Sequence, residues 1–211
     1  MKGDIYHILN RGIEKGAVFH EPDDYRRFVL GLYKFNNKGF ALRLSDENWL
    51  ANLPLQNKIV EILAWSLLPN HYHLLVQENI DGGAVDFVKR IGNGYTKYFN
   101  IKNNRSGYLF QNAAKIILVK RNEHFLYLPF YINANPVDLI ESDWGNKGIR
   151  NQERVLNFLE KYHWSSYQDH VGIANFPQIT NKQLFFKIFD TNQKQYKKNF
   201  LEWLGDVNLP R

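Results

Sequence analysis

Two apolar runs separated by only two residues constrain the fold of this chain more than any other feature. Residues 59–68 (IVEILAWSLL) and 71–77 (HYHLLVQ) lie on either side of Pro69 and Asn70, two residue types that favour turns. A two-residue connection can join antiparallel strands, whereas parallel strands need a crossover of about a dozen residues or more. The sequence therefore predicts a hairpin of two paired strands.

The segments around this hairpin alternate between strand and helix patterns. Short apolar stretches at residues 4–9 (DIYHIL) and 115–120 (KIILVK) predict two more strands. Helical spacing of apolar residues predicts helices over residues 22–35, from 81 to about 98, and from 122 to the residue before Pro136. The order strand, helix, two strands, helix, strand, helix indicates an α+β fold. We expect a ferredoxin-like or RRM-like antiparallel sheet with helices on one face.

The length of 211 residues fits one domain with appendages. We expect a main domain over residues 1–150 and a C-terminal helical extension over residues 151–211 that packs on it. The extension shows two or three amphipathic helical patterns. Residues 36–57 show no regular pattern and are expected to form a loop.

Basic residues predict a polyanionic partner. Lys and Arg number 27 against 21 Asp and Glu, a formal net charge of +6. A basic solvated surface would give the same sum, but between Lys89 and Lys120 the cations alternate with tyrosines and phenylalanines, a mixture that suits phosphates and unstacked bases. We expect nucleic-acid contacts from Arg11, Lys89, Arg90, Lys97, Arg105 and Lys115.

The absence of cysteine limits the possible metal ligands. Any metal ion must be held by histidine, carboxylate or amide groups, and a reducing cytoplasm is permitted. No stretch approaches the roughly 20 apolar residues of a membrane span, and the N-terminus lacks the apolar core of a signal peptide. We therefore expect a cytoplasmic protein with no membrane partner.

His71 and His73 form the strongest candidate metal site. They flank Tyr72 on a predicted strand, and side chains along a strand alternate between faces, so both imidazoles point to the same side and can share one ion. The alternative is a polar, half-exposed strand face. Against it, the pair follows a tight turn on an otherwise apolar strand, where polar groups need a partner.

The segment LLPNHYHLLV, residues 67–76, resembles the histidine-hydrophobic-histidine (HUH) motif of REP-associated tyrosine transposases. These are relatives of the single-tyrosine insertion-sequence transposases. Further segments match in the same order: YHILNRG, RSGYLFQ, YINANPV and WSSYQDHVG. The resemblance runs from about Tyr6 to Gly172 and implies transposase chemistry on DNA.

The resemblance also implies further site residues. The family's nucleophilic tyrosine lies on a helix after the fourth strand, and an amide one turn later completes the metal site. The matching positions are Tyr131 and Asn135, which lie on one helix face because they are four residues apart. Imidazole and oxygen ligands suit Mg²⁺ or Mn²⁺.

Other roles for these residues remain open. Tyr131 could belong to an apolar core stripe, and Tyr95, Tyr98 and Tyr127 compete as nucleophiles. His7 on the first strand is expected to be structural or to contact DNA rather than to bind the metal.

Two features depart from the family pattern. Ala113 and Ala114 replace an arginine and an aromatic residue, so one DNA contact is missing. Pro129 lies two residues before Tyr131, where it would kink the helix or mark its start.

The predicted function is metal-dependent cleavage and rejoining of single-stranded DNA through a 5'-phosphotyrosine intermediate. The resemblance implies hairpin-forming repeat DNA as the substrate, and a monomer is favoured over a homodimer. Two alternatives remain: a DNA-binding protein of the same fold that has lost turnover, and a metal-dependent hydrolase in which water replaces Tyr131.

Overall fold

The structure, a computed structural model, describes residues 1–39, 57–120 and 123–206. Most of the loop expected over residues 36–57 lies outside the described residues, as does Asn122 at the expected start of the third helix.

A four-stranded antiparallel sheet forms the centre of the fold. Its strands are β1 (Ile5–Arg11), β2 (Val60–Leu68), β3 (His71–Glu78) and β4 (Lys115–Leu118), in the spatial order β2-β3-β1-β4. The predicted hairpin is confirmed, because Leu68 pairs with His71 across the turn. The strand order is that of a ferredoxin-like sheet, so the predicted α+β fold is confirmed as well.

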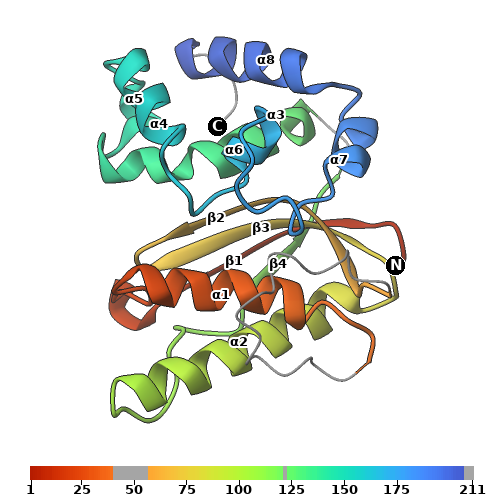
Figure 1. Cartoon of the computed structure of the whole chain (residues 1–211), viewed down its shortest axis with the longest axis vertical. Helices are drawn as coiled ribbons and strands as arrows, with labels where there is room; N and C mark the ends of the chain where they lie inside the picture. Colours follow the sequence, from red (N-terminus) through yellow and green to blue (C-terminus); the bar gives the residue numbers. More distant parts are fainter. Residues whose placement is uncertain (40–56, 121–122, 207–211) are drawn as a thin grey trace.

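Two long helices cover one face of this sheet. These are α1 (Pro22–Lys34) and α2 (Gly83–Lys102), which lie below the sheet in Figure 1. Alternate residues of β3, namely Tyr72, Leu74 and Val76, belong to the apolar core on this face. The even-numbered positions of β3 therefore hold the sheet against α1 and α2.

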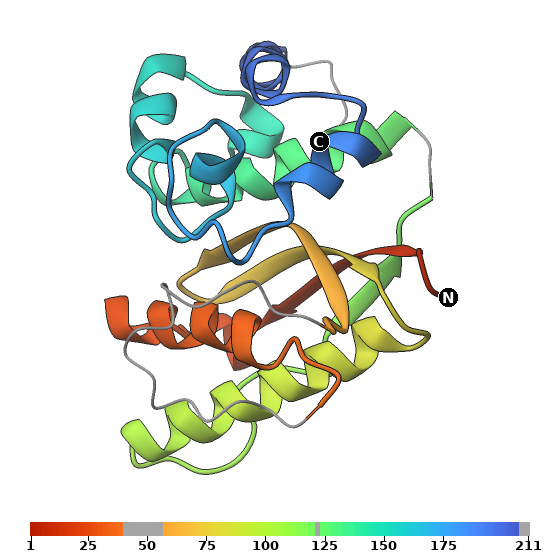
Figure 2. The same cartoon turned by 45° about the vertical axis from the view of Figure 1, so that its right-hand side comes forward.

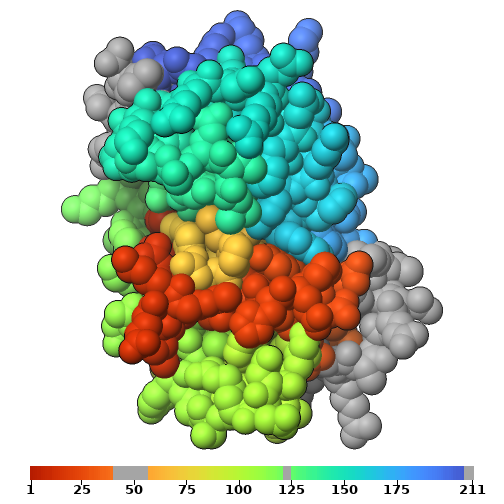
Figure 3. Space-filling view, turned by 90° about the vertical axis from the view of Figure 1, so that its left-hand side faces the viewer, coloured from red at the N-terminus to blue at the C-terminus, as the bar shows by residue number. Residues whose placement is uncertain are grey.

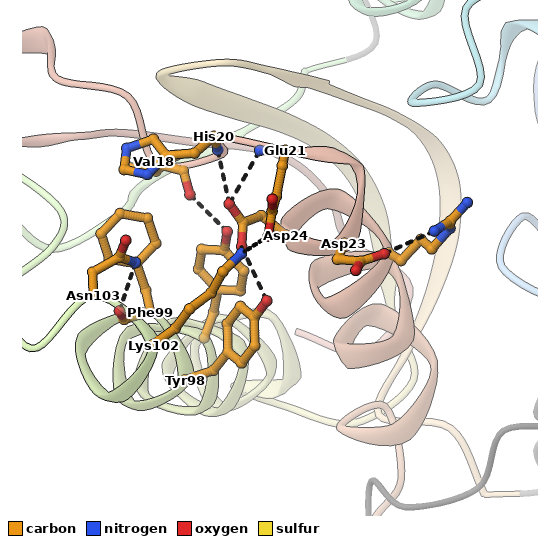
Figure 4. Close-up of polar contacts among 11 residues, drawn as sticks. Val18, His20, Glu21, Asp23, Asp24, Tyr98, Phe99, Lys102 and Asn103 are labelled. Carbon is orange, nitrogen blue, oxygen red and sulfur yellow. Dashed lines mark hydrogen bonds and ion pairs between the residues drawn. The ribbon is translucent and has the colours of Figure 1, made fainter.

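A buried ion pair joins the two helices on this face. Figure 4 shows Asp24 at the start of α1, accepting hydrogen bonds from Lys102 and Tyr98 of α2 and from the His20 backbone N–H. Burial raises the pKa of the Asp24 carboxyl, but these hydrogen bonds outweigh it and hold the pKa below its ordinary value. Asp24 therefore stays ionised and fixes α1 against α2.

The opposite face is covered by the third helix and the C-terminal part of the chain, as Figures 1 and 2 show. A second apolar core joins Ile5, Leu63 and Leu75 of the sheet to these helices. Their bounds are α3 (Glu123–Ala134), η3 (Asn135–Leu139), α4 (Trp144–Lys147), α5 (Gln152–Leu159), α6 (Tyr167–His170), α7 (Lys182–Ile188) and α8 (Gln193–Gly205). The helices expected on one face are thus complemented by a second helical layer on the other.

Two local expectations can be compared with the described helices. The last part of the chain forms α5, α7 and α8, in agreement with the expected two or three amphipathic helices, and it adds the four-residue α6, which is too short to produce an amphipathic pattern. Pro129 lies inside α3 and does not mark its start, since the helix begins at Glu123. None of the described helices is both long and apolar enough to cross a membrane.

Candidate active site

His71 and His73 lie side by side on the sheet face that α3 covers. Their ring centroids are 5.2 Å apart, and both side chains are buried. Leu75, two residues further along β3, belongs to the apolar core on the same face, as strand alternation requires. The strand thus places both imidazoles at the boundary between the sheet and α3.

The proton on His71 can be placed from its neighbour Asn70. The Asn70 amide nitrogen donates to the Lys15 carbonyl at 3.1 Å, so its oxygen Oδ1 is the atom that faces His71 Nδ1 at 2.6 Å. An oxygen of this kind can only accept, so Nδ1 carries the proton. His71 Nε2 therefore offers a lone pair, and burial, followed by the charge of Arg11, lowers the pKa of His71 to about 4.

Asn135 presents a second lone pair at the same point. Its amide nitrogen points to the Tyr131 carbonyl, 3.4 Å away, and its oxygen Oδ1 lies 3.5 Å from His71 Nε2. Both facing atoms are acceptors, and no proton lies between them. Two buried acceptors that face each other need a positive charge between or beside them, and a metal cation would supply it.

His73 makes its contact with His7 of β1. The distance from His7 Nε2 to His73 Nδ1 is 2.9 Å, and the two rings stack. If His73 Nδ1 donates, His73 Nε2 keeps a lone pair for a metal and His7 acts as the acceptor that orients the ring. Burial holds the pKa of His73 well below its usual range, with smaller contributions from His7 and His71.

Tyr131 extends from α3 next to these groups. Its ring meets the His73 ring edge-on, with centroids 5.9 Å apart, and it is half-buried. It also lines a hollow of about 400 Å³ together with Asn135, Asp138 and Trp144. Tyr131 is thus both adjacent to the histidine pair and accessible from this hollow.

A second hollow opens on the other side of His71, with a volume of about 470 Å³. Its lining includes Arg11, Lys15, Asn70, His71 and Asp138. Figure 3 views the molecule from this side, where atoms of the turn between β2 and β3 (gold) lie between the N-terminal segment (red) and the turquoise segment near residue 145.

Asp138 is common to both hollows, and sequence reasoning missed it. It lies three residues after Asn135 and seven after Tyr131, a helical spacing that could have identified it. Burial, followed by the charge of Asp143, raises the pKa of its carboxyl.

The competing tyrosines lie elsewhere. Tyr95 and Tyr98 belong to α2 on the far face of the sheet, where their hydroxyls donate to the Val18 carbonyl and to Asp24. Tyr127 lines a separate hollow between α3, α7 and α8. Of these four tyrosines, Tyr131 has the ring contact with His73.

The predicted DNA-binding residues fall into two groups. Arg90 pairs with Asp86 and donates to two carbonyls, and Arg105 donates to Asn100 and the Tyr108 carbonyl. Within the described part of the chain, no ion pair or side-chain hydrogen bond engages the other candidates, which are Arg11, Lys89, Lys97 and Lys115. Arg11 pairs with His71 in the sheet register, and Lys115 pairs with Leu9, so both lie on the face that carries the histidines.

A buried polar network, also missed by sequence reasoning, holds α3 in place. Asn133 donates to His170 Nδ1 at 2.9 Å and to the Tyr196 hydroxyl at 2.7 Å, and it accepts from the Ser166 hydroxyl at 2.7 Å. His170 Nε2 in turn donates to the Leu63 carbonyl of β2 at 3.0 Å. The network ties the helix turn between Tyr131 and Asn135 to the sheet.

The donor set fits a divalent cation. Over residues 1–39, 57–120 and 123–206, no cluster of three or more histidine, cysteine and acidic side chains is arranged to hold a metal ion. The fit therefore rests on two histidines and an amide, with His71 Nε2 and Asn135 Oδ1 left without a shared proton. Imidazole nitrogen and amide oxygen are ligands that Mn²⁺ accepts readily.

Of three comparisons with known proteins, the one with solved structures supports the fold. No protein-family model and no curated protein matches the chain. Among solved structures, it is similar to a REP-associated tyrosine transposase bound to a REP hairpin, with a TM-score of 0.51 and 16% sequence identity. The match covers 86% of this chain and 90% of that one. At this level of identity the similarity shows a shared fold.

Proposed function

We propose that this protein cleaves and rejoins single-stranded, hairpin-forming DNA, with Tyr131 as the nucleophile. One observation carries the proposal: Tyr131 lies against His73, while His71 Nε2 and Asn135 Oδ1 face each other as two acceptors 3.5 Å apart. The transposase with the similar fold is bound to a REP hairpin, which supports the same class of substrate here. We further propose that the protein acts as a monomer in the cytoplasm.

The proposed reaction exchanges one phosphodiester for another. The Tyr131 hydroxyl oxygen attacks phosphorus, a bond from that oxygen to phosphorus forms, and the bond to the 3'-oxygen breaks. The tyrosine proton is lost and the leaving strand gains one, so the products are a 5'-phosphotyrosine and a free 3'-hydroxyl. Because no water enters, the reverse reaction rejoins the strand.

His71, His73 and Asn135 are the proposed ligands of Mg²⁺ or Mn²⁺. When bound, the ion would polarise the phosphoryl group and neutralise charge on its oxygens. The chain's own contribution is orientation: Asn70 holds the His71 ring and His7 holds the His73 ring. The nucleophile on α3 and the amide ligand at the start of η3 lie four residues apart.

The rival function is DNA binding without turnover. Two departures from the resembled family favour it: Ala113 stands where that family has an arginine, and Pro129 lies two residues before Tyr131. Wild-type protein with Mn²⁺ and labelled hairpin DNA separates the two functions. The proposed enzyme forms an adduct that survives denaturation, whereas a binding protein retains affinity and forms none.

Tyr131→Phe is the decisive variant, because it keeps the ring and its packing but removes the attacking atom. We expect normal folding, normal hairpin binding and no adduct. Peptide mapping of the wild-type adduct should locate the DNA on the peptide that contains Tyr131. Cleavage that persists in Tyr131→Phe would indicate a hydrolase that uses water, and label on Tyr127 would reassign the nucleophile.

A further inference from the structure

A large cavity lies behind the candidate active site, on the other face of the sheet. Its volume is about 800 Å³. The floor consists of apolar side chains from β3, α2 and the segment before β4, among them Tyr72, Val88, Leu109 and Phe110. Amide side chains, including Asn10, Asn93 and Asn112, complete the lining. The cavity thus combines an apolar surface with hydrogen-bonding groups.

The wall of this cavity is held in place before any ligand binds. The Ile13 backbone N–H donates to the Leu109 carbonyl at 3.1 Å, and the Gln111 N–H donates to the Arg11 carbonyl at 2.9 Å. These bonds fasten the segment before β4 to the end of β1. The Arg105 guanidinium also donates to the Tyr108 carbonyl, which fixes the backbone that presents the 85% exposed Tyr108 side chain.

One face of α2 lines the cavity with two lysines. Val85, Lys89, Gly92, Thr96 and Lys97 recur at helical spacing on this face. In the described part of the molecule, neither Lys89 nor Lys97 makes an ion pair, whereas Arg90, on the next face, is paired with Asp86. Two ammonium groups at a cavity without anionic partners favour an anionic ligand.

The cavity and the candidate active site share three strands. Tyr72 lies between His71 and His73, Asn10 precedes Arg11, and Ile116 follows Lys115. Because neighbouring residues of a strand point to opposite faces, the cavity and the active site lie back to back. β4 is the edge strand of the sheet and borders both the cavity and the face that carries the histidines.

We infer that this cavity binds one unpaired base of the DNA substrate, with the flanking phosphates at Lys89 and Lys97. The inference rests on the proposed function for the identity of its ligand. An apolar floor stacks against the base, amide groups can bond to its polar edge, and the two lysines neutralise the backbone. A neutral apolar ligand would leave both lysines without a role, and an unpaired base exposes the polar edge that the amide groups can reach.

Gly92 offers a direct way to fill the cavity. It lines the cavity, and a Cβ added there would meet no atom within 4 Å. Replacing a helix-interior glycine also raises helix propensity, so Gly92→Trp should fold at least as well as the wild type. Ile101→Trp is the matched control, because Ile101 is exposed on the same helix and does not line the cavity.

The test is binding of a fluorescent hairpin with single-stranded flanks, measured by anisotropy in a chelator. Single abasic residues are placed at each flank and loop position in turn. We expect Gly92→Trp to weaken binding about tenfold, the size of one lost base stack, and Ile101→Trp to have no effect. At one abasic position the affinity of the wild type should fall by the same factor, whereas the affinity of Gly92→Trp should not fall any further.

Three results would overturn the inference. Gly92→Trp could bind the hairpin as tightly as the wild type, or its loss of affinity could add to the loss at every abasic position. It could also bind a blunt duplex more weakly by the same factor as the hairpin. Phosphotyrosine formation is measured separately with Mn²⁺. The wild type could form no adduct while the losses from Gly92→Trp and from one abasic position are still not additive. That result would refute the proposed catalysis but not the base site. If the wild type binds neither hairpin nor flanks, both proposals fail.

Discussion

Two buried polar sites, one around His170 and one around His71, differ in how their hydrogen bonds are satisfied. Around His170, each polar atom has a partner: Nδ1 accepts from Asn133 and Nε2 donates to Leu63. Around His71, the Nδ1 proton is satisfied by Asn70, but Nε2 faces another acceptor on Asn135. The first arrangement is that of a structural network, and the second is the one on which the proposed metal site rests.

Asn133 of α3 and Asn135, the first residue of η3, should separate these roles most clearly. Asn133→Ala removes the partner of His170 Nδ1 and of the Tyr196 hydroxyl, whereas Ser166 keeps its hydrogen bonds with the Trp65 backbone. It should reduce the free energy of unfolding by at least about 2 kcal/mol, since each unpaired buried group costs about 1–3 kcal/mol. Asn135→Ala should change it by less than about 1 kcal/mol, because it removes one of two facing acceptors. Urea unfolding measures both variants, and equal losses would abolish the distinction.

The dependence of adduct formation on Mn²⁺ should be changed by Asn135→Ala and not by Asn133→Ala, the reverse of their effects on stability. Asn135→Ala removes one proposed ligand, so it should slow adduct formation roughly 10- to 100-fold at low Mn²⁺ and recover at high Mn²⁺. Asn133→Ala should show no such recovery in the fraction that remains folded. A titration of adduct yield against Mn²⁺ at a temperature where both variants fold provides the comparison.

His71→Ala extends the contrast to the strand. It should abolish metal-dependent cleavage but leave hairpin affinity nearly intact, because affinity comes chiefly from phosphate contacts spread over the basic surface. Isothermal titration with Mn²⁺ should show weaker binding, and anisotropy should show similar DNA affinity. Wild-type cleavage in this variant would remove His71 from the proposed metal site.

Stability should fall in acid because of His170. Burial lowers the pKa of this histidine from 6.5 to about 3. Between these values the unfolded chain binds a proton that the folded chain excludes, so the contribution is complete above pH 6.5 and is lost as the pH falls toward 3. Each unit in this window costs up to about 1.4 kcal/mol.

His170→Gln isolates that contribution, because an amide can still donate to Leu63 and accept from Asn133. The plot of unfolding free energy against pH should therefore be less steep in the variant below pH 6.5. His7, His71 and His73 also have lowered pKa values, so both proteins should keep part of the slope. Parallel plots would show that His170 does not titrate with unfolding.

Patterns among neighbouring residues in the sequence predicted the sheet. The features that were not predicted depend on contacts between residues far apart in the sequence. The hairpin at Pro69-Asn70 and the alternation of His71 and His73 depend on neighbours in the sequence, and both appear in the structure. In the network around Asn133, Asn133 and His170 are 37 positions apart in the sequence, and His170 and Leu63 are 107 positions apart. Contacts over such separations leave no periodic pattern in the sequence. The same holds for His7, which contacts His73 from another strand.

His7 provides a smaller test of the metal site. His7→Phe keeps an aromatic ring near His73 but removes the nitrogen that contacts His73 Nδ1, so His73 loses the partner proposed to orient its ring. Mn²⁺ affinity should fall by about tenfold, within the range for the loss of a partner that orients a ligand, while hairpin affinity stays constant. His7→Gln supplies an amide acceptor and should recover part of the loss. If both variants bind Mn²⁺ as tightly as the wild type, His7 serves only to pack the sheet.

The smallest expected effect concerns two basic side chains, one that is already bonded within the protein and one that is not. Lys115 is exposed on the face that carries the histidines and has no ion pair among the described residues, whereas Arg90 is bound to Asp86 and to two carbonyls. Lys115→Ala should therefore weaken hairpin binding modestly and reduce the slope of log affinity against log salt by about 1, the value for one lost phosphate contact. Arg90→Ala should leave that slope unchanged and lower stability instead, because its side chain already donates to the protein. Affinities measured across a salt series decide between them, and a reduced slope in Arg90→Ala would show that an internally bonded arginine can still serve the DNA.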